Sequence, residues 1–234
     1  MNRENAMPFV YAAPLHPGST DVVYTAADGT KTLRRGGSRA WRNNNPGNIE
    51  SGKFAKSQGA IGQTGRFAVF PDVQTGRAAV FALLHKSIYI NLSVADAVAK
   101  YAPPSDNDTE NYKRLIAKLT SLDTMRKLSS LSSDEFTRVI DAVGTVEGYF
   151  VGSELPIQRV VGAKSDGKRL TQVLIEGYNS YISMETAIQL AESGQLDVVV
   201  VRRAHGTCYL RSRADGFAEN NLSAIATRDV RHNA

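Results

Sequence analysis

The spacing of hydrophobic residues divides the chain into a helical middle part and two flanking parts with strand-like patterns. Between residues 72 and 147, apolar side chains recur at intervals of three and four, which indicates amphipathic helices. Serine or aspartate at the expected N-caps, and the Pro103-Pro104 pair, delimit these helices. We predict helices at residues 72–89, 93–101, 109–119 and 132–147.

The flanking parts carry different signals. Residues 1–37 are rich in Pro, Gly, Thr and Ser and are expected to form an extended arm with at most one hairpin. After Gly152 we expect two hairpins, with turns at residues 165–167 and 204–206, and a short helix between them from Ser183 to Gly194. The expected fold class is α+β, with an arm, a mainly helical domain over residues 38–152 and a small ββαββ domain over residues 155–234.

The composition is ordinary for a folded protein, with 42% hydrophobic and 22% charged residues. No apolar run approaches the ~18–20 residues that a membrane span requires, so no span is expected. Residues 1–18 lack an apolar stretch followed by a small-residue cleavage site, so we expect synthesis in the cytoplasm without a signal peptide. The single cysteine and four scattered histidines lack metal-ligand spacing, so neither a metal nor a cofactor is expected.

The net charge of +5 is unevenly distributed along the chain. Eight Lys or Arg residues and one acidic residue, Glu50, lie between Lys31 and Arg66. A basic segment favours an anionic polymer, either nucleic acid or the bacterial wall, unless it is an ordinary solvated surface. The sequence lacks helix-turn-helix spacing, a zinc knuckle and aromatic-basic repeats, which makes nucleic acid the weaker of these alternatives.

Glu147 stands out in the last predicted helix. On a wheel of 100° per residue it falls near the centre of the apolar arc, whereas Asp134, Arg138 and Asp141 lie on the opposite side. Burial disfavours the charged form of a carboxyl group, and the negative end of a helix dipole acts in the same direction. A carboxyl group that keeps its proton suits a general acid that cleaves a glycosidic bond. Alternatively, the helix ends before Glu147 and the side chain turns into solvent.

The run Arg-Asn-Asn-Asn-Pro-Gly-Asn-Ile at residues 42–49 resembles the signature of a family of bacterial and phage peptidoglycan hydrolase domains, found in virion proteins and in toxins delivered by contractile machines. The resemblance covers about 110 residues. It continues through segments 59–62, 66–71, 76, 101–109, 112 and 147–148.

This family is in turn similar to the second half of the β-N-acetylglucosaminidases of the lysozyme superfamily. The loop at Asn44–Ile49, a strand at Arg66–Phe70 and the helix from Asp72 follow the order of motifs in those enzymes. There, a helix that ends in the catalytic glutamate precedes the asparagine loop, whereas Glu147 follows it here. The inward Glu147, followed by Gly148 and Tyr149, resembles the end of that helix, and from this order we infer a lysozyme-like domain that is circularly permuted.

The activity that the resemblance implies is cleavage of the glycan strand of peptidoglycan, by a glucosaminidase, a muramidase or a lytic transglycosylase. The protein would act in the periplasm or cell wall, as a virion lysin or as an antibacterial effector of a route such as type VI secretion rather than Sec. An immunity protein or a component of the secretion machine or virion would be a further partner. The alternative function is a non-catalytic wall-binding or virion structural protein.

The site residues that we expect follow from these motifs. Glu147 is the catalytic acid, and Glu50 is available as a second carboxylate because it follows the asparagine loop directly. A lytic transglycosylase needs no second carboxylate, because a hydroxyl of the substrate attacks. The expected substrate-binding residues, each with an alternative role in the loop or core, are Asn44, Asn45, Asn48, Tyr89, Tyr101 and Tyr149.

The small second domain resembles a bacterial domain of unknown function. The resemblance rests on Tyr209-Leu210-Arg211-Ser212, Asp215 and Asn220-Asn221-Leu222. It implies no chemistry, so wall binding, binding of an immunity protein and a role as a delivery adaptor all remain open for this domain.

Overall fold

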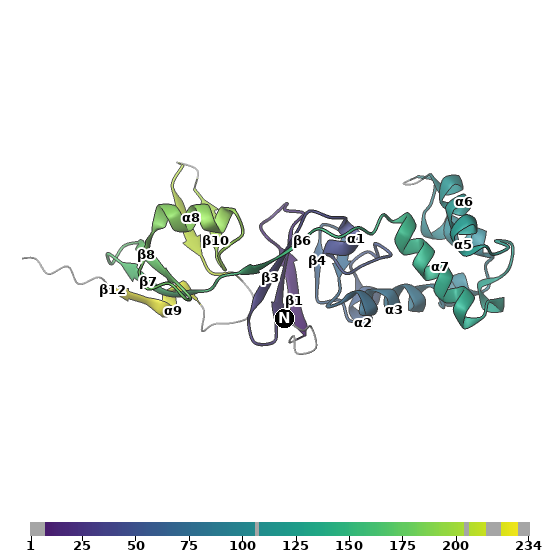
Figure 1. The fold of residues 1–234 in the computed structure, drawn as a ribbon, viewed down its shortest axis with the longest axis horizontal. Coiled ribbons are helices and arrows are strands. Elements are labelled where there is room, and N and C mark those ends of the chain that lie inside the picture. Colours follow the sequence, from purple (N-terminus) through teal and green to yellow (C-terminus); the bar gives the residue numbers. More distant parts are fainter. Residues whose placement is uncertain (1–7, 106–107, 204–205, 214–220, 229–234) are drawn as a thin grey trace, which may run out of the picture.

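The computed structural model describes residues 8–105, 108–203, 206–213 and 221–228. The molecule is elongated and has a helical part, a six-stranded sheet and a smaller α+β part, with the sheet in the middle (Figure 1). No helix within these residues is long and apolar enough to span a bilayer.

The six-stranded sheet joins segments that lie far apart in the sequence. Its strand order is β5-β4-β1-β2-β3-β6. The strands are β1 (Phe9–Pro14), β2 (Val22–Ala26), β3 (Lys31–Arg35), β4 (Gly62–Thr64), β5 (Phe67–Val69) and β6 (Ser153–Ile157). Every residue of β2 is buried, as expected for a central strand that is covered on both faces.

The expectation of a mainly helical lysozyme-like domain preceded by an arm is wrong. The structure has 36% helix and 26% strand, and residues that we expected in an arm form three strands of the central sheet. The prolines and glycines that suggested an arm lie at strand ends and turns instead. Pro14 ends β1, and Gly29 adopts φ 82° between β2 and β3. The permuted lysozyme-like fold is therefore not supported.

The helical part agrees with the hydrophobic pattern, except that the helix expected over residues 72–89 is divided into two, Val73–Leu84 and Ser87–Ile90. The expected caps Asp72, Ser93 and Ser132 each accept a hydrogen bond from a backbone N–H of the first turn, and Ser132 forms a complete capping box with Glu135. The helices are α1 (Arg39–Arg42), α2 (Lys53–Ser57), α3 (Val73–Leu84), α4 (Ser87–Ile90), α5 (Val94–Tyr101), α6 (Thr109–Thr120), the 3-10 turn η2 (Leu128–Ser130) and α7 (Ser133–Val146).

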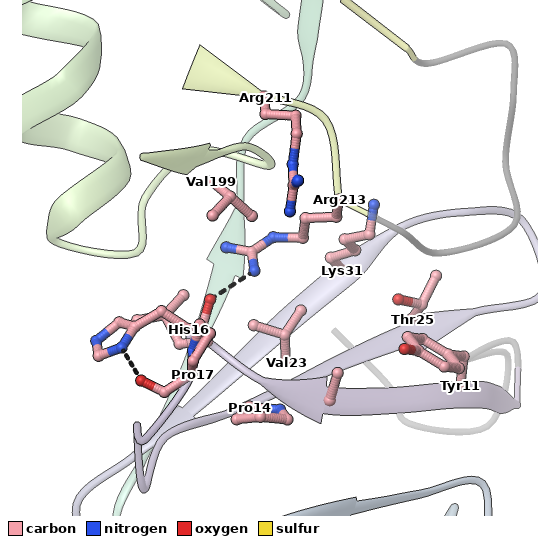
Figure 2. A pocket seen from close by; sticks show the side chains of 12 residues that line it. Tyr11, Pro14, His16, Pro17, Val23, Thr25, Lys31, Val199, Arg211 and Arg213 are labelled. Atoms are coloured by element: carbon pink, nitrogen blue, oxygen red, sulfur yellow. Dashed lines mark hydrogen bonds between the residues drawn. The ribbon is translucent and has the colours of Figure 1, made fainter. Parts of the chain in front are cut away.

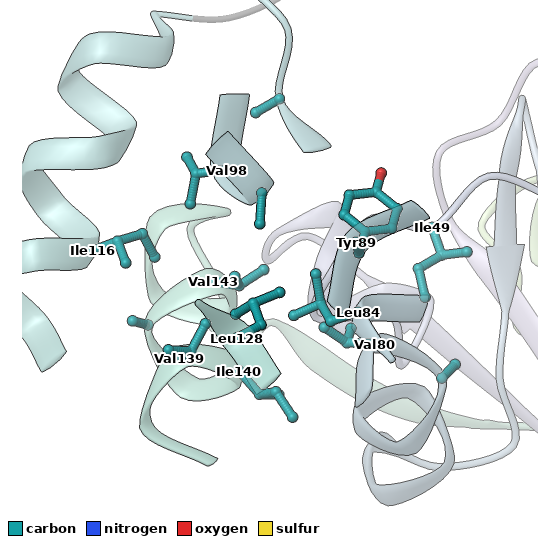
Figure 3. Packing of buried hydrophobic residues seen from close by; sticks show 14 of the residues in the cluster. Ile49, Val80, Leu84, Tyr89, Val98, Ile116, Leu128, Val139, Ile140 and Val143 are labelled. Carbon is teal, nitrogen blue, oxygen red and sulfur yellow. The ribbon is translucent and has the colours of Figure 1, made fainter. Parts of the chain in front are cut away.

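The helices share one hydrophobic core. Val80 and Leu84 of α3 and Ile116 of α6 belong to one cluster, with the inner face of α7, on which Ile140 and Val143 lie, between them (Figure 3). All five side chains are buried. This core fixes α6 and α7 side by side, and it places the end of α7 next to the loop that precedes Ile49.

The C-terminal part contains more elements than the expected ββαββ. It has a sheet in the order β12-β7-β8-β9, a separate β10-β11 hairpin, and helix α8 in contact with both. The elements are β7 (Val160–Ser165), β8 (Leu170–Ile175), β9 (Ile182–Ser183), α8 (Met184–Glu192), β10 (Val199–Arg202), β11 (Cys208–Arg211), α9 (Leu222–Ile225) and β12 (Ala226–Arg228). Pro156, expected at the domain boundary, lies inside β6 and is paired with Thr32.

Candidate functional site

Glu147 lies at the end of α7, as the C-cap residue. Its backbone N–H donates to the carbonyl of Val143 at 2.9 Å, so it continues the last turn of the helix. Gly148 then takes φ 72°, a left-handed conformation that commonly ends helices. The side chain of Glu147 is half-buried and does not turn freely into solvent, because two hydrogen bonds hold it.

The two donors come from distant parts of the chain. Asn48 donates from Nδ2 to Oε2 of Glu147 at 2.7 Å, and Tyr112 of α6 donates from its hydroxyl to Oε1 at 3.1 Å. Each carboxylate oxygen therefore accepts a hydrogen bond from an uncharged donor. The two contacts fix the plane of the carboxyl group without neutralising it.

Two further tyrosines adjoin this cluster. Tyr101 donates its hydroxyl hydrogen to the carbonyl of Gly47, the residue before Asn48. Burial raises the pKa of Tyr101 well above its usual range, and the charge of Glu147 and the neighbouring Tyr89 act in the same direction. Burial, followed by the charge of Glu147, also raises the pKa of Tyr112 strongly. Both phenols therefore remain protonated donors.

Hydrogen bonds between asparagine side chains and the backbone hold the asparagine loop in its conformation. Asn45 is fully buried, donates from Nδ2 to the carbonyls of Ile49 and Ala68 at 2.8 and 3.0 Å, and accepts from the N–H of Ile49. Asn44 is 2% exposed and donates to the carbonyls of Phe70 and Pro71. The side-chain amides of the predicted substrate-binding residues Asn44 and Asn45 are thus directed into the protein.

Close packing of glycine fixes the same loop against the helices. A Cβ on Gly76 of α3 would lie 1.9 Å from the carbonyl oxygen of Asn44. A Cβ on Gly47 would lie 2.5 Å from the Tyr101 hydroxyl. Only glycine fits at position 76, where the neighbour is backbone, and a side chain at position 47 would displace Tyr101 and Val80. Both glycines belong to the motifs that carried the family resemblance, and together they set the position of Asn48 beside Glu147.

The other predicted site residues lie in different settings. Glu50 is exposed and forms an ion pair with Arg66, with 3.2 Å between Oε1 and Nε. Tyr89 is 8% exposed and belongs to the helical core, although it is near enough to affect Tyr101. Tyr149 is half-buried, and burial raises its pKa, with Arg34 and Glu154 as its charged neighbours. Tyr149 therefore belongs to the side of the sheet rather than to the Glu147 cluster.

Tyr112 was not predicted as a site residue, although its motif was recognised. Its spacing in α6 indicated a core residue, and its ring is indeed buried, but the hydroxyl reaches Glu147. Three further carboxylates lie in the motifs of the resemblance or next to them. Asp72 and Asp108 cap α3 and α6, and Asp106 lies outside the described residues.

The cluster can hold a carboxyl group in both protonation states. Asn48 Oδ1 is buried and has no hydrogen-bond partner within the part of the chain that the structure describes. When Glu147 is a carboxylate, Nδ2 of Asn48 donates a hydrogen bond to it. When Glu147 is protonated, rotation of the Asn48 amide lets Oδ1 accept a hydrogen bond from the carboxyl group. The described residues contain no group of three His, Cys, Asp or Glu side chains that could hold a metal ion.

In comparison with known proteins, the C-terminal part is similar to one family. Residues 157–224 match a family described as "Protein of unknown function (DUF3892)". No match to a curated protein was found for the chain. The DUF3892 match begins at the last residue of β6, so the Glu147 cluster lies outside it.

Proposed function

We propose that the protein cleaves the glycan strand of bacterial peptidoglycan, with Glu147 as the general acid. One observation carries the proposal: Asn48, Tyr112 and Glu147 come from three separate motifs of the resemblance and meet at a single carboxyl group. A carboxyl group held by neutral donors and half-exposed to solvent can transfer a proton to a glycosidic oxygen.

The roles of the other carboxylates favour a reaction that needs only one acidic residue. Glu50 is paired with Arg66, and Asp72 and Asp108 cap helices. Glu147 would first protonate the leaving oxygen and then, as the carboxylate, accept the proton of a substrate hydroxyl that attacks the same sugar carbon. The product of that reaction is an anhydro sugar, so we propose a lytic transglycosylase.

The test is to incubate purified peptidoglycan with the wild-type chain and with Glu147→Gln, and to identify the released fragments by mass spectrometry. We expect anhydro ends from the wild-type protein and none from the variant. Reducing ends would show hydrolysis and would overturn the transglycosylase assignment. If neither protein releases fragments, the enzymatic function is wrong.

A non-catalytic wall-binding function is the second candidate, and one observation favours it. The bonds of Asn48 and Tyr112 to Glu147 also tie the loop and α6 to α7, which is a structural use of the same carboxylate. In that case both proteins would sediment with insoluble peptidoglycan and neither would release fragments. Delivery of the protein as an effector or virion component stays a prediction.

A further inference from the structure

A cavity of about 220 Å³ lies between the central sheet and the C-terminal part (Figure 2). Strands β1, β2 and β3 form one wall, with the turn after β1, and strands β10 and β11 with the residues that follow form the other. It is remote from the Glu147 cluster, none of whose residues line it. Neither the proposed cleavage reaction nor the DUF3892 match assigns it a role.

Charged side chains line both walls of the cavity. Lys31 forms a buried ion pair with Asp197, and their side chains are 1% and 5% exposed. Arg213 also approaches Asp197, at 3.4 Å from Nε to Oδ1, and donates to the carbonyl of Leu15 at 2.7 Å. Asp197 therefore lies between two of the cationic side chains that line the cavity.

Arg211 is the group best placed to bind a ligand. Its side chain leaves β11 and points toward Arg213 and Lys31, at the mouth of the cavity (Figure 2). No carboxylate within the described residues forms an ion pair with it, whereas Arg202 on the same hairpin is paired with Glu192. A guanidinium group in this position can bind a carboxylate through two parallel hydrogen bonds.

The remaining walls are mostly apolar and limit the size of a ligand. Leu15, Val23 and Val199 line the cavity together with Pro14 and Pro17. Pockets for drug-sized ligands typically measure about 300–1,000 Å³, so this cavity suits a smaller ligand, such as one or two amino-acid residues. Apolar walls with a cation at the mouth match a carboxylate attached to a small apolar side chain.

We propose that this cavity binds the C-terminal carboxylate of a peptide whose last residue is small and apolar, with Arg211 as the carboxylate-binding residue. The source that we assign is the peptide stem of peptidoglycan, which ends in alanine, and this assignment rests on the proposed function. The C-terminal part would then hold the stems while the Glu147 cluster acts on the glycan strand.

The test uses the full chain and the probe diacetyl-Lys-D-Ala-D-Ala, with binding followed by NMR and titration calorimetry. We expect saturable binding that Arg211→Gln weakens at least about tenfold, because a charge-assisted hydrogen bond is lost. Arg202→Gln is the matched control, since Arg202 lies on the same hairpin but does not line the cavity, and it should bind as the wild type does. Equal binding by Arg211→Gln would overturn the proposal.

A second variant separates loss of the site from loss of the fold. Val199 lies directly opposite Arg211 in the hairpin, so Val199→Glu supplies a competing carboxylate within the cavity. It should abolish binding without lowering the melting temperature. Probes that end in a carboxamide should not bind, and equal affinity for them, or for inorganic phosphate, would overturn a carboxylate site.

The probe contains no glycan, so its binding is independent of glycan cleavage. Binding of the D-alanine probe by a chain that releases no fragments from peptidoglycan would leave the cavity assigned and overturn the proposed function. Equal affinity for the L-alanine form would instead point to a protein C-terminus and overturn the wall as the source.

Discussion

The side-chain amide of Asn48 donates a hydrogen bond of 2.7 Å to Glu147, although 99 positions separate the two residues in the sequence. Asn48 has φ 45°, a left-handed conformation that asparagine tolerates better than most residues. The asparagine loop and the end of α7 therefore form one unit. Replacement of either residue should change the position of the other side chain, and several of the predictions below depend on this contact.

Replacing Glu147 with Gln should abolish cleavage of peptidoglycan while leaving the fold intact. A positioned general acid contributes about 10²–10⁴-fold to rate, and the amide has no proton of suitable acidity to donate. Gln can still accept from Tyr112, and Asn48 can turn its amide to present Oδ1. The stability should thus change by less than about 1 kcal/mol. Fragment release and melting temperature measure the two effects.

Asp141→Asn is the matched control for Glu147→Gln. Asp141 lies on the same helix, is half-exposed and forms an ion pair with Arg77 at the surface. Loss of an exposed pair costs roughly 0–1 kcal/mol, so the variant should melt slightly lower and retain full activity. Equal losses of activity in the two variants would show that Glu147 has no special role.

Asn44→Ala should mainly lower stability, whereas Asn48→Ala should mainly lower activity. Asn44 is buried, and its side chain bonds to two carbonyl groups and accepts from Arg34 of β3. Its loss should destabilise the protein by about 2–4 kcal/mol, because it leaves buried groups unsatisfied. Asn48→Ala should lower activity and change stability less. The reverse pattern in thermal melts and turnover assays would refute these roles.

Local signals predicted the helices because caps and apolar spacing act within a few residues. Ser132 and Glu135 specify the start of α7 by themselves, and the same wheel placed Glu147 inward. The sheet was missed because its pairing is long-range. Lys31 lies opposite Ile157 in the β3–β6 ladder, 126 positions away in sequence, and no local pattern encodes such a register.

The site was predicted only in part, for the same reason. Glu147 and Asn48 were expected in one site and are in contact, but the pairing of Tyr112 with Glu147 depends on the packing of α6 against α7. Asn44 and Asn45 were expected to bind substrate because they belong to the asparagine loop of the resemblance, with a role in the loop itself as the alternative. Their burial follows from the turn that places their side chains beneath β5, which composition does not indicate.

Stability should fall steeply above about pH 10. In the unfolded chain the tyrosines ionise near that pH, whereas in the folded protein burial keeps them protonated to higher pH. The pKa values of Tyr24, Tyr101 and Tyr112 are raised in the folded state, chiefly by burial. Below pH 10 these groups are protonated in both states and have no effect. Above it, each favours unfolding by roughly 1.4 kcal/mol per pH unit until its folded-state pKa is reached.

Melting temperatures from pH 8 to 11, with phenolate absorbance, test this dependence. Tyr112→Phe should show a shallower decline than the wild type, because one titrating group is removed. Tyr178→Phe, at an exposed position, should leave the slope unchanged. The same slope in all three proteins would show that burial of these phenols does not control alkaline stability.

The point at which the C-terminal part is removed should decide whether the rest folds. Strand β6 completes the central sheet, and its Ile157 is 6% exposed in a cluster with Leu15, Val23 and Leu33. Burial of an isoleucine side chain contributes roughly 1.5–3 kcal/mol, and loss of β6 would also leave β3 as an unpaired edge. A chain that ends at residue 158 should therefore melt higher and aggregate less than one that ends at residue 152.

Both truncated chains contain the Glu147 cluster, so the longer one should still cleave soluble glycan fragments. Equal melting temperatures and light scattering would show that β6 is dispensable, and a folded but inactive 1–158 chain would mean that the C-terminal part completes the active site.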